Sequence, residues 1–170
     1  MSTDKSLEFI DQFENHYKYD CGYMREMLTT SPDGFKVFEG FMPMGRYQKV
    51  TPTDVIFVAK VAAMKSEDCG ACTQLNIRMA IEAGVSKDVL KCVINNGEGL
   101  CEELKDVYNF SVALATNGLM PEGLSEKLEL KYSREVLIEL GLAIAATKVY
   151  PTIKRALGHA ESCALYDFEF

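Results

Sequence analysis

The stretch Glu67-Asp68-Cys69-Gly70-Ala71-Cys72-Thr73-Gln74-Leu75-Asn76 places two cysteines three residues apart, where an apolar-periodic segment begins. With Asp68 as the N-cap, Cys69 is the first helical residue and Cys72 lies one turn further on. Residues i and i+3 share a helix face and lie about 5–6 Å apart, within reach of a disulfide. Unpaired backbone N–H groups and the helix dipole at that end favour a thiolate. The spacing therefore predicts a pair that cycles between dithiol and disulfide.

Two other interpretations fit a single C-x-x-C pair. The cysteines can be small buried hydrophobes, or they can be half of a zinc site. A zinc site needs two more ligands at metal spacing. The remaining cysteines form no second C-x-x-C and both histidines are isolated in sequence, so we expect no metal and four reduced thiols, at Cys21, Cys92, Cys101 and Cys163.

Composition limits the class of protein. The chain has 170 residues, of which 48% are hydrophobic, enough for one domain with a real core. No run of eighteen apolar residues occurs and the N-terminus lacks a signal-peptide core, so we expect no membrane span. Six cysteines without a signal favour the cytoplasm. The net charge of −7 argues against a nucleic-acid partner.

Helical periodicity covers nearly every segment and strand signals are absent. We expect a single-domain, all-α bundle of about six to eight helices. Thr51 before Pro52 is a helix start, and a helix over about 68–84 ends at Gly84 as its C′ residue. Turn chemistry at 31–34 and Pro43 should interrupt the N-terminal helices, and Pro151 should kink or restart the last one.

Two stretches carry a family resemblance. In the first, Ala62–Val85, the C-x-x-C opens a helix that ends in Ala-Gly-Val, and the second runs from Tyr132-Ser133-Arg134-Glu135 to Ala156-Leu157-Gly158. With the helix order between them, they resemble the alkylhydroperoxidase D / carboxymuconolactone decarboxylase family over residues 50–158. Residues 1–50 look like a helical extension packed on this core, and 159–170 are a tail.

The resemblance implies several properties. These are an all-helical fold, a homo-oligomer, and a thiol peroxidase or disulfide reductase whose substrate is a peroxide or a protein disulfide. In the best-known branch, electrons come from a dihydrolipoamide-bearing protein and pass to a peroxiredoxin, without organic cofactor or metal. The C-x-x-C indicates this branch, because the decarboxylases proper typically lack the pair. Helix position favours Cys69 as the attacking thiol, whereas the family's proton relay serves the second cysteine, here Cys72.

The relay residues of the family are not matched. Asn76 stands where the family has histidine, and Phe57 stands where it has glutamate. Asparagine cannot exchange a proton near pH 7, so we expect weak peroxidase activity. Five acids are candidates to line the site or to carry the proton in place of the missing relay residues. Each can alternatively be a solvated or capping group: Asp54, Glu67, Asp68, Glu135 and Glu139.

Two other functions remain open. A lactone decarboxylase or isomerase would need a basic or histidine-lined anion site, and a non-catalytic oligomeric member would keep the fold without the relay. An oligomer is also expected from the aromatic stripe between Phe35 and Met44, which adds more apolar surface than one small subunit can bury.

Overall fold

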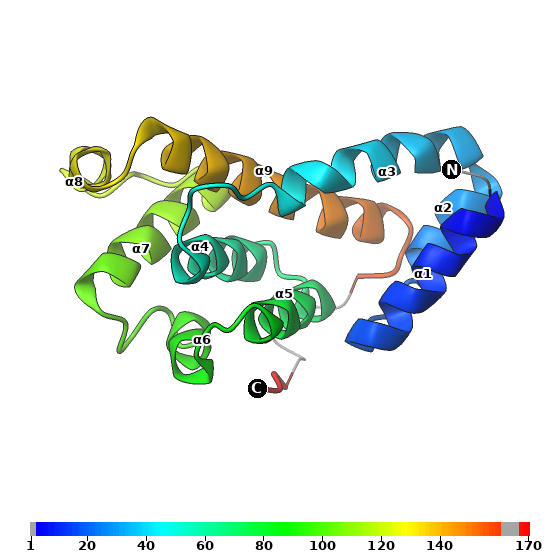
Figure 1. Cartoon of the computed structure of the whole chain (residues 1–170), viewed down its shortest axis with the longest axis horizontal. Coiled ribbons are helices and arrows are strands. Elements are labelled where there is room, and N and C mark those ends of the chain that lie inside the picture. The colour runs from blue at the N-terminus through cyan, green and yellow to red at the C-terminus, as the bar shows by residue number, and fades with distance from the viewer. Residues whose placement is uncertain (1–2, 161–166) are drawn as a thin grey trace.

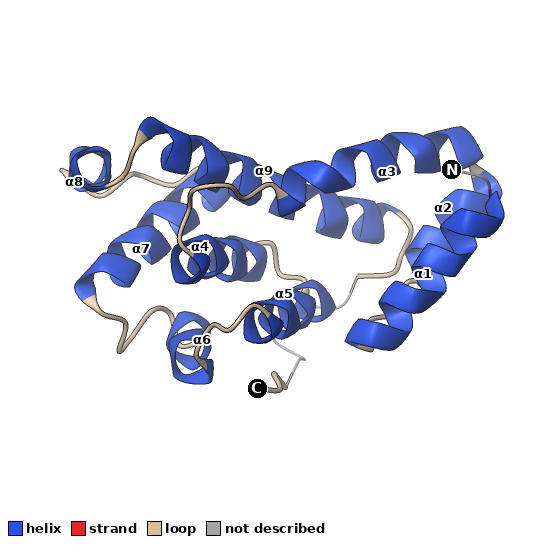
Figure 2. Ribbon diagram, viewed as in Figure 1, coloured by secondary structure: helices blue, strands red, loops and turns tan. Residues whose placement is uncertain are grey.

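A computed structural model of the chain describes residues 3–160 and 167–170, and all regular structure in this part is helical. Figure 2 shows the helices and connecting loops, without a strand among the described residues. The all-α prediction is confirmed. The described part has nine helices, above the expected six to eight, because the short segments α2, α6 and α8 each form a helix of their own. The bounds are α1 Thr3–Tyr17, α2 Gly22–Thr30, α3 Pro32–Arg46, α4 Thr53–Ser66, α5 Gly70–Glu82, α6 Lys87–Ile94, α7 Glu102–Thr116, α8 Leu124–Lys131 and α9 Arg134–Ala156.

Helix α4 lies in the middle of the molecule and packs against α5, α6, α7 and α9 (Figure 1). Every residue from Val55 to Met64 is buried. A helix that is apolar on all sides must be covered on all sides, and this is the position that α4 takes. The main core forms around it, with partners on five helices and in the C-terminal residues Phe168 and Phe170.

The N-terminal helices α1–α3 form a second apolar cluster. It includes Phe35, Phe38 and Met42, which are buried against the C-terminal half of α9 and against α5. The aromatic stripe is therefore used inside the subunit, so it does not supply the free apolar surface on which the oligomer prediction partly rested. Figure 1 shows α3 alongside α9, with α1 and α2 at the same end of the molecule.

The predicted interruptions of the N-terminal helices are right at 31–34 and wrong at Pro43. Helix α2 ends at Thr30, and Ser31 is then the N-cap of α3, accepting a hydrogen bond from Gly34 N, with Pro32 in the first turn. Helix α3 also continues through Pro43 to Arg46, because packing of the face that carries Phe38 and Met42 outweighs the missing N–H of an exposed proline. Helix α9 continues through Pro151 to Ala156, so it does not restart there, and a kink at this proline stays a prediction.

Helix α9 is long and apolar enough, by length and composition, to cross a membrane. This is weak evidence for a span, since the core helix of a soluble protein passes the same test. In this fold α9 packs against α3, α4 and α7 and buries the charged residues Glu139 and Lys154.

Candidate functional site

The two cysteines at the start of α5 are joined by a disulfide. The sulfurs are 2.10 Å apart and the Cα atoms 5.3 Å apart, as the i, i+3 spacing predicts. The cap assignment is corrected: Cys69, with extended backbone, is the N-cap, and α5 begins at Gly70. Asp68 instead takes a left-handed conformation with φ of 50° in the turn between α4 and α5, which prevents it from opening the helix. Cys72 therefore lies in the first turn of α5, next to its unpaired N–H groups.

Both cysteines are buried, with Cys69 0% and Cys72 1% exposed. Their surroundings differ. Cys72 lines a cavity of about 60 Å³ between α3, α4, α5 and α9, and Cys69 is not among its lining residues. A volume of this size accommodates a few waters or one peroxide group. Any reagent that arrives through the cavity therefore meets Cys72 first.

The cavity has polar groups on an otherwise apolar wall. Asn76 follows Cys72 by one turn and donates from Nδ2 to the Cys72 carbonyl at 2.9 Å. Lys60 of α4, Tyr150 of α9 and Arg46 at the end of α3 also line it. Burial raises the pKa of Tyr150, so its hydroxyl stays protonated near neutral pH. No carboxylate of the described residues lines this cavity, and the charged groups among its described lining residues are both cations.

Tyr19, in the loop between α1 and α2, contacts Cys72 from the N-terminal region. Its hydroxyl lies 3.8 Å from Cys72 Sγ, within the range of a sulfur hydrogen bond, and its side chain is buried. Burial raises its pKa, so the hydroxyl is a proton-bearing donor when Cys72 is a thiolate. The ammonium of Lys154 lies 4.8 Å from the centroid of the Tyr19 ring. The residues before 50 thus contribute directly to the cysteine site.

The structure brings Asn76 to the cavity but not the predicted acids. Glu67 pairs with two residues of α9, at 3.4 Å from Arg155 and 3.8 Å from Lys148. Asp54 and Glu135 are exposed in the first turns of α4 and α9. None of these three lines the cavity.

The carboxylate of Glu139 has a structural role. The residue is 2% exposed, and its carboxylate accepts hydrogen bonds from the backbone N–H groups of Lys49, Val50 and Thr51 and from the Thr51 hydroxyl. Burial raises the pKa of this carboxyl, but these hydrogen bonds outweigh burial and lower it. The Thr51 hydroxyl is thus committed to Glu139, and Pro52, not Thr51, is the N-cap of α4.

Phe57 lies beside the cysteine helix. It lines the cavity together with Cys72 and Asn76. The two positions at which the sequence departs from the family pattern therefore meet at one place, and neither provides an ionisable group there.

The remaining described cysteines are unbridged. Cys21, Cys92 and Cys101 are free thiols, as predicted, and Cys163 lies outside the described residues. Burial, with the nearby Glu14, raises the pKa of the Cys21 thiol to about 12, so it is unreactive near neutral pH. Within the described residues, no group of three or more histidine, cysteine or acidic side chains is placed to hold a metal ion.

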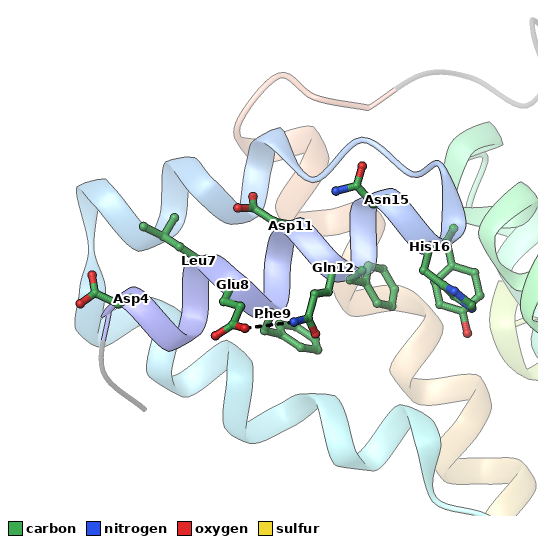
Figure 3. Close-up of a pocket in the computed structure, with 10 residues that line it drawn as sticks. Asp4, Leu7, Glu8, Phe9, Asp11, Gln12, Asn15 and His16 are labelled. Carbon is green, nitrogen blue, oxygen red and sulfur yellow. Dashed lines mark hydrogen bonds between the residues drawn. The ribbon is translucent and has the colours of Figure 1, made fainter.

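Another hollow lies elsewhere on the described surface. Figure 3 shows it along α1, where Asp4, Glu8, Asp11 and His16 are among the lining residues. Its volume is about 880 Å³, but all its lining residues come from this one helix and none is a cysteine. It is the outer surface of a helix, and we do not assign chemistry to it.

Comparisons with models of protein families, with curated proteins and with solved structures gave no match. The site is therefore interpreted from its own geometry and from the sequence resemblance.

Sequence reasoning missed Lys60, Tyr19, Tyr150 and Arg46. Only Lys60 carries a local signal, since it is the single charged residue within the apolar run from 55 to 64. The other three come from segments far away in the chain.

Proposed function

We propose that this protein is a thiol peroxidase of the alkylhydroperoxidase D-like type, cycling through the Cys69–Cys72 disulfide. The observation that carries the proposal is that one cysteine of a disulfide-bonded C-x-x-C pair, at a helix N-terminus, lines a small cavity with polar groups on its wall. In the reduced protein, Cys72 thiolate attacks a hydroperoxide, forming a sulfenic acid and releasing an alcohol or water. Cys69 then displaces the sulfenic hydroxyl as water and closes the disulfide.

The cavity favours a small hydroperoxide over a protein disulfide as the oxidant. Both sulfurs are buried, so a partner protein's disulfide cannot reach them without local opening of the fold. A peroxide group fits the 60 Å³ cavity. The same restriction applies to the reductant, which we expect to be a slender dithiol such as a dihydrolipoamide arm, with a peroxiredoxin as a further partner. The cysteine usage favours the cytoplasm as the compartment of this antioxidant chemistry.

A homo-oligomer is part of the proposal. The oligomer is supported by exposed apolar side chains around α8: Leu119 before it, Leu130 on it and Ile138 in the second turn of α9. Figure 1 shows α8 at the end of the molecule opposite α1 and α2, where a second copy can approach. Light scattering that gives the monomer mass at micromolar concentration would exclude this assembly.

A second candidate, a lactone decarboxylase or isomerase, is favoured by one observation. Lys60 and Arg46 supply the basic groups at the cavity that such an activity requires. The small volume weighs against a ring-sized substrate. The dependence of activity on the redox state of the protein distinguishes the two candidates, because a lyase would act equally well in the oxidised and reduced protein.

The experiment is a titration of thiols before and after a small excess of hydrogen peroxide, with peptide mapping by mass spectrometry. The proposal expects loss of two thiols and a disulfide-linked peptide holding Cys69 and Cys72, reversed by a dithiol. Cys72→Ser should abolish peroxide consumption, while Cys101→Ser, which removes an exposed thiol, is the matched control. Oxidation confined to other cysteines would exclude the peroxidase and leave the lyase and the non-catalytic protein as candidates.

A further inference from the structure

Lys60 is a buried cation for which the fold itself gives no reason. Its side chain is 8% exposed, and its neighbours on α4 from Val55 to Met64 are otherwise apolar. The Nζ atom lies 5.1 Å from the centroid of the Phe57 ring. Among the residues that the structure describes, no carboxylate or hydrogen-bond acceptor contacts this ammonium. Burying a lysine without an anionic partner is unfavourable, so a lysine kept there points to an anion that the resting oxidised state does not contain.

The cavity shows where such an anion arises. Lys60 of α4 and Cys72 of α5 both line it. The other titratable groups on this cavity are Arg46 of α3 and Tyr150 of α9, so none of them is a carboxylate. In the disulfide, Cys72 is neutral. On reduction it can become a thiolate, which is the anion that this ammonium lacks.

Resting on the peroxidase function proposed above, we propose that the Lys60 ammonium holds Cys72 as a thiolate and protonates the oxygen released from the hydroperoxide. Lys60 is then a catalytic residue that takes the place of the absent relay. In the first step the Cys72 sulfur–oxygen bond forms and the peroxide O–O bond breaks. The leaving oxygen takes a proton from Lys60, giving an alcohol or water and a neutral amine.

The next steps restore the site. The Cys69 thiol attacks the Cys72 sulfenic acid, the sulfur–sulfur bond forms, and the hydroxyl leaves as water with the Cys69 proton. The Lys60 amine regains a proton from solvent. An external dithiol then reduces the disulfide and becomes a disulfide itself; one of its protons goes to Cys69, which returns as a thiol, and the other goes to solvent, so Cys72 returns as a thiolate. Burial, reinforced by the charge of Arg46, lowers the pKa of Lys60, which makes it a better acid near neutral pH than an exposed lysine.

The test compares reduced wild type with Lys60→Met and Lys60→Arg. The first measurement is the pH dependence of Cys72 alkylation by iodoacetamide, followed at that peptide by mass spectrometry. Because the thiolate is the reacting species, loss of the ammonium should lower the rate at pH 7 by about tenfold or more in Lys60→Met. Lys60→Arg keeps the charge and should retain most of the rate. Lys87→Met, which removes an exposed cation from α6, is the matched control.

The second measurement is peroxide consumption. A guanidinium does not release a proton near neutral pH, so Lys60→Arg should lose about 10²-fold in turnover although its thiolate persists. Formation of the Cys69–Cys72 disulfide and the helical circular dichroism spectrum confirm folding of each variant, and Lys60→Gln replaces Lys60→Met if the latter fails this check.

The outcomes separate the two proposals. Equal alkylation profiles for wild type and Lys60→Met would overturn the thiolate contact, and wild-type turnover by Lys60→Arg would overturn the proton donation. A wild type that does not consume peroxide would remove the peroxidase function together with the proton donation. In that case the alkylation comparison, which uses no peroxide, still decides whether Lys60 stabilises the thiolate.

Discussion

Replacing Lys60 by methionine should make the oxidised protein more stable. Methionine keeps a side chain of similar shape, while a charge is lost from a residue that is only 8% exposed and has no described anionic partner. Buried charges carry a desolvation penalty of several kcal/mol, and replacing them with apolar groups of similar volume typically adds about 1–3 kcal/mol to stability. We expect a gain in that range at pH 7, or about 2–4 °C in Tm for each kcal/mol in a chain of this size.

The pH dependence gives the prediction a sign. Because the pKa of Lys60 is lowered from 10.5 in the folded state, the unfolded chain binds more protons between that lowered pKa and 10.5. The free energy of unfolding of wild type therefore rises with pH across this window. The penalty is fully present below the folded pKa and is relieved as the pH rises through it. The advantage of Lys60→Met should shrink over the same window, by about 1.4 kcal/mol for each pH unit that separates the two pKa values.

Urea unfolding of oxidised wild type, Lys60→Met and the control Lys87→Met, at a series of pH values from 7 to about 10.5, measures both effects. The control should follow wild type at every pH. A Lys60→Met protein that is less stable than wild type at pH 7 would show that the ammonium has a stabilising partner in the folded chain. The same conclusion would follow if the stability advantage of Lys60→Met over wild type grew with pH. In either case the inference that the Lys60 ammonium pairs with the Cys72 thiolate would fail.

Three further predictions concern the groups around the cavity. Tyr19→Phe removes a hydroxyl 3.8 Å from Cys72 Sγ and should slow alkylation of reduced Cys72 at pH 7 several-fold; an unchanged rate would mean that the hydroxyl does not bind the thiolate. Gly45→Ala would put a Cβ 3.2 Å from the Tyr150 hydroxyl, closer than ordinary contact, so it should narrow the cavity and slow peroxide-driven disulfide formation. Gly40→Ala is the control, because a Cβ there meets nothing within 4 Å. Glu139→Gln should destabilise the fold by about 2–3 kcal/mol at pH 7, because it loses charge-assisted hydrogen bonds to the segment before α4. Since the pKa of Glu139 is lowered from 4.5, this stabilisation is present above pH 4.5 and is lost as the pH falls through the folded pKa. Urea unfolding at pH 7 and at acidic pH would check both effects.

Much of the fold can be predicted from local sequence. The period of apolar residues and Gly84 after α5 are found as predicted, and Ser86 and Ser133 are N-caps of the kind that local sequence indicates. These signals act over one or two helical turns, so the chain itself carries them. The boundaries that failed involve competition between local and distant contacts. Pro43 alone argues for a break, and only the packing of the aromatic face of α3 against α9 keeps the helix intact.

The candidate site divides in the same way. The spacing of Cys69 and Cys72 determined the disulfide, because residues one turn apart at a helix start are held within bonding distance by local geometry. Which of the two faces a cavity could not be predicted from that spacing, since both are buried and only the packing of α3, α4 and α9 around α5 leaves space beside Cys72. The contact from Tyr19, 53 residues away in sequence, likewise depends on how the N-terminal helices fold back over the cysteine helix. The sequence by itself thus determined which two sulfurs are bonded, and only tertiary packing decided which of the two residues lines the cavity and which charged groups line it too.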